Sequence, residues 1–116
     1  FEINKLLAAK MKDLDYKISI SEIHHKEKLD SPSGTAKSIL HDIKEINNLA
    51  EINIDSQRVD NNIGTHEVKY SSTIDNIIFK HEANNRDGFA LGALLAAEWI
   101  INKKGIFTFA DVLKSL

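Results

Sequence analysis

The sequence predicts an α+β fold in which about four strands form one mixed sheet and helices cover one of its faces. Two observations lead to this fold class. Segments in which apolar residues recur at helical spacing are interspersed with segments in which apolar and polar residues alternate. Their order along the chain is helix, strand, helix, three strands and helix. A sheet covered on one side has a second, open face, which some further surface must cover.

The first predicted helix and strand lead towards a pair of histidines. Residues 1–12 predict an amphipathic helix, because apolar residues recur on one side of it. Those apolar residues are Ile3, Leu6, Leu7 and Met11. Residues 16–22 then alternate between apolar and polar side chains, which predicts a half-buried strand. This strand runs towards His24 and His25, so both can lie at a strand end.

The middle of the chain predicts a second helix followed by three strands. Ser33 is a good N-cap, because its side-chain oxygen can accept hydrogen bonds from first-turn amides. We expect this helix to run to about Ile46 and to stop at Asn47 and Asn48. The expected strands cover residues 51–58, 66–73 and 76–83. The last two predict a hairpin, because residues 74–76 between them have turn chemistry.

The C-terminal part predicts a buried helix. From Gly88 to Ile101 almost every residue is apolar or small, so we expect burial over most of the helix circumference. The segment is too short to span a membrane. Residues 103–105 are expected to close the helix, with two lysines in the last turn and a glycine as C-cap. Phe107 and Phe109 predict a short extended piece, and residues 110–116 a final helical turn or two.

The composition excludes several classes of protein. With 116 residues, of which 42% are hydrophobic and 28% charged, the chain fits one globular domain. Its formal net charge of −2 argues against general nucleic-acid binding. The absence of cysteine excludes disulfides and thiolate metal sites, and with no visible signal peptide or membrane span we expect a cytoplasmic protein. The chain opens at Phe1 as if within a helix, so we expect a piece of a longer protein.

The start of the second helix predicts an anion-binding site. The first-turn amides of a helix carry partial positive charge, so Ser33, Gly34 and Thr35 can donate N–H and O–H hydrogen bonds to an anion. Gly34 lets the anion approach the backbone closely. The alternative interpretation is that these three residues only cap the helix.

Side chains just before this helix predict proton exchange. Lys28 adds a second positive group for a carboxylate or phosphate, and His24 and His25 can exchange a proton near neutral pH. Together with the helix start, they indicate a site that holds a small anionic molecule and protonates it. The alternative is that the two histidines only belong to the surface.

The remaining polar candidates have simpler interpretations. His41, His66 and His81 lack the spacing of metal ligands, so we expect no metal site, and His66 and His81 are expected to be hydrogen-bonded side chains on strands. Arg86 can clamp a carboxylate or form a structural or interdomain salt bridge. Trp99 is expected in the core.

Residues 22–36 closely resemble the motif E-x-H-H-x-x-K-x-D-x-P-S-G-T-A of 4-hydroxy-tetrahydrodipicolinate reductases, formerly called dihydrodipicolinate reductases. The motif is long and specific. The resemblance continues through Arg58, residues 64–68, His81, Arg86, Phe89, Ala90, Gly92, Ala93 and residues 105–107. It covers essentially the whole chain, and it indicates that residues 1–116 are similar to the C-terminal domain, which binds substrate and forms tetramers.

The resemblance implies an NADPH- or NADH-dependent oxidoreductase of lysine and diaminopimelate biosynthesis. Such an enzyme converts 4-hydroxy-tetrahydrodipicolinate, a cyclic dicarboxylate, to tetrahydrodipicolinate by reducing an imine. In this family the cofactor sits on an N-terminal Rossmann domain, and no G-x-G-x-x-G segment occurs here. The chain alone is therefore expected to be inactive, and residues 86–116 are expected to pack against that domain. The family forms homotetramers through the sheet of this domain, which would cover the open face.

The resemblance also implies roles for individual residues. His24 corresponds to the proton donor or acceptor, and Lys28 to a second proton-donating or charge-stabilising group. The expected substrate-binding residues are His25, Ser33, Gly34 and Thr35. Arg86 and Phe89 are candidates for contacts with the cofactor or between domains. Two other functions stay open, namely a stand-alone anion-binding module without redox chemistry and a purely structural oligomerisation domain.

Overall fold

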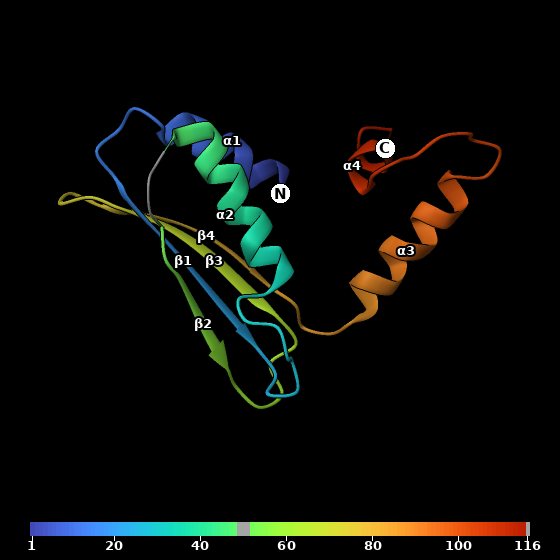
Figure 1. Cartoon of the computed structure of the whole chain (residues 1–116), viewed down its shortest axis with the longest axis horizontal. Helices are drawn as coiled ribbons and strands as arrows, with labels where there is room; N and C mark the ends of the chain where they lie inside the picture. The colour runs from blue at the N-terminus through green and yellow to red at the C-terminus, as the bar shows by residue number, and fades with distance from the viewer. Residues whose placement is uncertain (49–51, 116) are drawn as a thin grey trace. The chain divides into compact units, whose positions relative to one another are not determined.

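The computed structural model describes residues 1–48 and 52–115, which form two compact units, Phe1–Glu82 and Ala83–Leu116 (Figure 1). The first unit contains α1 (Glu2–Met11), β1 (Lys17–His24), α2 (Gly34–Asn47), β2 (Ile54–Arg58), β3 (Thr65–Ser71) and β4 (Asn76–Glu82). The second contains α3 (Asp87–Trp99) and α4 (Phe109–Leu113). The predicted order of elements is confirmed. Glu51 of the predicted strand 51–58 and Leu116 of the predicted last helical segment lie outside the described residues.

The four strands form one mixed sheet in the order β2-β1-β3-β4. β1 runs parallel to β2 and antiparallel to β3, and β4 pairs antiparallel with β3 as the predicted hairpin. Helices α1 and α2 lie over the same face of this sheet (Figure 1). The predicted α+β fold is therefore confirmed.

The core lies between this sheet face and α2. The predicted alternation of β1 is confirmed, because Ile20, Glu22 and His24 are buried while the side chains between them are more exposed. Ile20 lies opposite Val68 of β3, and both pack in one apolar cluster with Ile43 of α2. These buried side chains fix which face of β1 points inward, because a slip of one residue would turn all of them outward.

The apolar side predicted for α1 is confirmed for Leu7 and Met11, which pack in or against the core, and wrong for Ile3 and Leu6. Ile3 and Leu6 are 62% and 61% exposed, whereas Asn4, Ala8 and Met11 are buried. Ala8 is 0% exposed, and a side chain of this size lets two helices approach closely where they pack. The small residue, rather than the larger isoleucine and leucine, therefore sets the rotation of the helix about its axis.

The prediction of a buried C-terminal helix is wrong, because α3 in the second unit is largely exposed. No described residue of α3 is buried, and Phe89, Leu91 and Leu94 are each more than half exposed. Within its own unit, α3 packs against α4, a helix of five residues that covers little of a 13-residue helix. In the described part of the chain, no helix has both the length and the apolar composition to cross a bilayer.

The end of α3 also differs from its prediction. The C-cap is Ile100, and the chain turns at Asn102 with a left-handed φ of 65°. Lys103 and Gly105 therefore lie beyond the helix, and Lys103 instead packs its ammonium over the partly buried Trp99 ring at 4.3 Å. The predicted extended piece is absent from residues 107–109, because Thr108 forms a capping box with Asp111 and α4 begins at Phe109.

The start of α2 is attached to the sheet by a hydrogen bond between the Ser33 side chain and His66 of β3, 3.0 Å apart. Ser33 is the N-cap, as predicted, and its Oγ also accepts from the Ala36 amide at 3.1 Å. Burial of the His66 ring is the main cause that lowers its pKa from 6.5 to about 4, and the neighbouring His24 adds to this effect. His66 is therefore neutral near pH 7, and its predicted role as a hydrogen-bonded polar side chain is confirmed.

The low pKa of His66 predicts a loss of stability in mild acid. The unfolded chain binds a proton at this residue below about pH 6.5, but the folded protein does so only near pH 4, so stability falls as the pH drops between these values. The expected loss in the free energy of unfolding is about 1–2 kcal/mol, because a half-buried ring keeps part of its hydration. Urea unfolding measured from pH 7.5 to 4.5 checks this.

In this experiment, His66→Gln removes the titrating group and should flatten the curve between pH 6.5 and 4.5. His41→Gln is the matched control, because the His41 side chain is 70% exposed on α2 and should leave the curve unchanged. Identical slopes for His66→Gln and the unmodified chain would contradict the assignment.

Candidate active site

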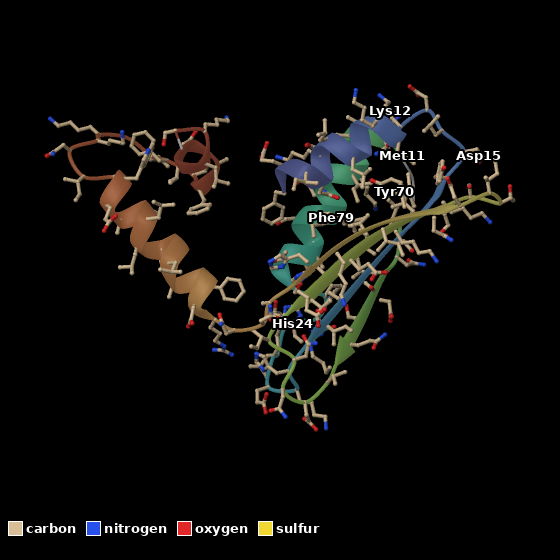
Figure 2. The ribbon with its side chains drawn as sticks, turned by 180° about the vertical axis from the view of Figure 1, so that it is seen from behind. Met11, Lys12, Asp15, His24, Tyr70 and Phe79 are labelled. Carbon is tan, nitrogen blue, oxygen red and sulfur yellow. The ribbon has the colours of Figure 1, made fainter. Side chains whose placement is uncertain are left out.

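Polar side chains from several segments meet at one end of the sheet. Glu22 and His24 end β1, and the strand register sets Arg58 of β2 opposite His24 and His66 of β3 opposite Glu22. The loop that follows β1 leads to Ser33 and the start of α2. His24 lies towards this end of the sheet and Tyr70 towards the other (Figure 2).

Glu22 is the centre of the hydrogen-bond network. Glu22 is 0% exposed, and one carboxylate oxygen, Oε2, is hydrogen-bonded to Nδ1 of His24. Nη1 of Arg58 donates to Oε1 at 3.0 Å and to Oε2 at 3.2 Å. The backbone N–H of Ser33 donates to Oε1 at 3.3 Å. One buried carboxylate therefore connects β1, β2 and the start of α2.

The network keeps Glu22 ionised. Burial by itself would raise the pKa of the carboxyl, but hydrogen bonds from His24 and Arg58 outweigh that effect and the pKa is lowered. A carboxylate can only accept hydrogen bonds, so each of its partners donates.

The other nitrogen of His24 lies beside Gly64. A Cβ atom at position 64 would approach Nε2 of His24 to 3.2 Å, which is tighter than ordinary packing. The His66 ring packs edge-on against the His24 ring, with centroids 5.0 Å apart. His24 is thus fixed by Glu22 on one side and enclosed by small or neutral groups on the other.

At the start of α2, the hydrogen-bond donors of Ser33 are used within the protein, whereas Gly34 and Thr35 are exposed to solvent. Ser33 is 2% exposed, and both its backbone N–H and its hydroxyl are hydrogen-bonded within the protein. Gly34 and Thr35 are exposed. The donors that an anion can reach at this helix start are therefore those of Gly34 and Thr35, whereas Ser33 holds the helix in position.

Lys28 and His25 pair with acidic residues of the same loop. Nζ of Lys28 lies 2.8 Å from Oδ1 of Asp30, and this ion pair lowers the pKa of the aspartate. Nδ1 of His25 lies 3.0 Å from Oε2 of Glu27, whose side chain is 81% exposed. The acidic partners are solvent-exposed, with side chains 52% exposed at Asp30 and 81% at Glu27, so these contacts contribute little stability and Lys28 and His25 can exchange their partners for another carboxylate.

The predicted site residues fall into two groups. His24, His25, Lys28 and the start of α2 all belong to the first unit, and Glu22 links His24 directly to Ser33. Arg86 and Phe89 belong to the second unit, where Arg86 precedes α3 and Phe89 is 59% exposed. Among the described residues, no cluster of three or more His, Asp or Glu side chains could hold a metal ion.

Sequence reasoning missed the roles of Glu22 and Arg58 and the partner of His66. A signal for Glu22 was present, because the alternation of β1 puts a carboxylate on the same face as the buried Ile20, two residues before a histidine. Arg58 gave no such signal, since its contact with Glu22 spans 36 residues. His66 was expected on a strand, but its partner Ser33 is 33 residues away.

Comparisons with known proteins agree with this architecture. The family model described as "Dihydrodipicolinate reductase, C-terminus" matches residues 1–113. A protein of Christiangramia forsetii named 4-hydroxy-tetrahydrodipicolinate reductase is 48% identical over 128 residues, covering 100% of this chain and 54% of the relative. A protein of the same name from Thermosipho africanus is 43% identical over 101 residues, covering 86% of this chain and 44% of the relative. The chain thus spans about half the length of these relatives.

A solved structure shares the fold. It is described as a dipicolinate-bound dihydrodipicolinate reductase from Paenisporosarcina sp. TG-14. Its TM-score is 0.64 at 24% sequence identity, and the match covers 90% of this chain and 49% of that chain. The resemblance found in residues 22–36 is confirmed by the family match over nearly the whole chain, and the chain belongs to the family of dihydrodipicolinate reductase C-terminal domains.

Proposed function

We propose that this chain is the substrate-binding and proton-transferring part of an NAD(P)H-dependent 4-hydroxy-tetrahydrodipicolinate reductase of lysine and diaminopimelate biosynthesis. The observation that carries the proposal is the Glu22 carboxylate, which is hydrogen-bonded both to the His24 ring and to the Ser33 amide at the start of α2. A proton-exchanging group and an anion-binding helix start thereby share one anchor. The names of the relatives support the same reaction.

A cyclic dicarboxylate fits the charges of the site. One carboxylate would accept hydrogen bonds at Gly34 and Thr35, in the exposed first turn of α2. Lys28 would bind the second carboxylate after leaving Asp30, and His25 would do the same after leaving Glu27. The dipicolinate named in the related solved structure is a small dicarboxylate of this kind.

The chemistry assigned to this chain is the proton step. Reduction of a C=N bond leaves an electron pair on the nitrogen, which must take up a proton. His24, with Nδ1 held by Glu22, would exchange that proton through Nε2, and the Lys28 ammonium would stabilise the developing charge or supply a second proton.

Cofactor binding is proposed to depend on residues outside this chain. The sequence has no G-x-G-x-x-G segment, so its own residues do not fit a dinucleotide pyrophosphate by that route. We propose that NADPH or NADH is held mainly by an N-terminal Rossmann domain. Arg86 and the exposed Phe89 would then contact that domain or its cofactor.

The open face of the sheet is proposed to form a homotetramer in the cytoplasm. Strand alternation puts Ser19, Ser21, Glu67 and Lys69 on this face, opposite to the helices. The register pairs Ser21 with Glu67 and Ser19 with Lys69. The same register puts the exposed Ile78 opposite Lys69, so this face can bury apolar surface and also form hydrogen bonds and ion pairs with a second copy of itself.

The proposed function predicts binding of pyridine-2,6-dicarboxylate. Titration should shift the ring signals of His24 and His25 and the amide signal of Thr35 in NMR spectra. Lys28→Ala should weaken the affinity at least about tenfold, because it removes a charge-assisted hydrogen bond. Lys26→Ala is the matched control, since Lys26 pairs with Asp60 on the surface and should change the dissociation constant less than twofold.

The same titration separates the alternatives. Binding without redox activity in the full-length protein would indicate a stand-alone anion-binding module. If none of the three signals moves, the chain is an oligomerisation domain and the proposed function is wrong.

The proposed function also predicts how a change at His24 affects catalysis by the full-length protein. His24→Gln should lower kcat by about a hundredfold to ten-thousandfold while KM changes only several-fold, because the proton step is made in the transition state. His41→Gln, at an exposed position of α2, is the control and should leave both constants unchanged. Equal losses in kcat and affinity would assign His24 a binding role, and turnover by residues 1–116 alone with NADPH would contradict the need for a second domain.

A further inference from the structure

We propose that Glu22 is the positioning residue of this site: it holds the proton of neutral His24 on Nδ1, so that Nε2 is the atom that exchanges protons. The role of His24 in catalysis rests on the proposed function. The assignment of its tautomer rests only on the contacts of Glu22, and it can be tested without substrate.

The contacts of Glu22 leave no choice for the His24 proton. Oε1 accepts from Arg58 and from the Ser33 amide, and Oε2 accepts from Arg58 and faces Nδ1 of His24. A carboxylate that is fully buried and ionised has no hydrogen to donate. Two bare acceptors facing each other would leave both buried groups unsatisfied, so Nδ1 must be the donor.

Arg58 fixes the orientation of Glu22. Its guanidinium donates from Nη2 to the carbonyl of Asp30 at 2.6 Å and from Nη1 to the carbonyl of Gln57 at 2.7 Å. Because Asp30 also pairs with Lys28, the loop that carries the lysine is joined to the same guanidinium. Glu22 therefore cannot turn away from His24 without losing its hydrogen bonds from this held guanidinium and from the Ser33 amide.

The pair of Glu22 and His24 differs in burial from the similar pair of Glu27 and His25. His25 and Glu27 repeat the spacing of His24 and Glu22, with a carboxylate two residues from the histidine. The Glu27 side chain is 81% exposed, whereas that of Glu22 is 0% exposed. Water can replace Glu27 as the partner of Nδ1 but cannot reach Glu22, so only His24 has its tautomer imposed by the protein.

The neighbours of His24 favour the same assignment. Gly64 adds no side-chain polar group beside Nε2. The adjacent His66 uses its own Nε2 for the Ser33 hydroxyl. Nε2 of His24 thus faces small or occupied groups, while Nδ1 faces an anion.

The test reads the ring nitrogens of His24 by two-bond 1H–15N NMR on the 116-residue chain at about pH 9, where histidine rings are neutral. In the unmodified chain, Nδ1 should have the shift of a protonated nitrogen and Nε2 that of a bare one. In Glu22→Gln, the amide oxygen should face the two donors Arg58 and Ser33, which turns the amide NH₂ towards His24. Nδ1 must then accept, so the two shifts should exchange.

The controls make the outcome specific. Glu27→Gln removes the exposed carboxylate beside His25 and should leave both His24 shifts unchanged. The proposal is overturned if unmodified His24 carries its proton on Nε2, or if folded Glu22→Gln keeps it on Nδ1. The first of these measurements needs no variant, so a Glu22→Gln chain that fails to fold does not prevent the test. Failure to bind pyridine-2,6-dicarboxylate would count against the proposed function and leave the tautomer assignment intact.

Discussion

A carboxylate without contact to solvent is the constraint on which this site depends. Moving an ionised group out of water costs several kcal/mol, and the cost is offset only if the group is paired and hydrogen-bonded. Glu22 meets this condition through Arg58, His24 and the Ser33 amide. Since these partners come from β1, β2 and the start of α2, the sheet and the helix must meet at one end for the charge to be tolerated.

The same constraint separates the fixed groups of the site from the adjustable ones. Glu22, His24 and Ser33 are buried, and their hydrogen bonds join elements of regular secondary structure, so their geometry is set before a ligand arrives. Lys28 and Thr35 are more accessible and lie in a loop and a first helical turn. Rigid groups suit the exchange of a proton at a defined atom, whereas accessible groups suit the capture of a charged ligand from water.

Local sequence patterns predicted much of the fold. The alternation in β1, the N-cap at Ser33 and the hairpin of β3 and β4 each depend on residues close in sequence, and each is confirmed. The rotation of α1 was not predictable in this way, because Ala8 is buried through its packing with other elements rather than through its hydrophobicity. The apolar segment of α3 likewise has no preferred side, so its pattern carries no information about what covers it.

In the candidate site, too, groups that are close in sequence could be predicted, whereas contacts between distant residues could not. The histidines, the lysine and the helix start lie within one stretch of twelve residues, 24–35, and could be identified from their order. The pairing of Glu22 with Arg58 could not, because it joins positions 36 residues apart and depends on β2 running parallel to β1. A motif can therefore identify the groups that meet a ligand, while the group that decides which ring nitrogen is available emerges only when the strands are brought together.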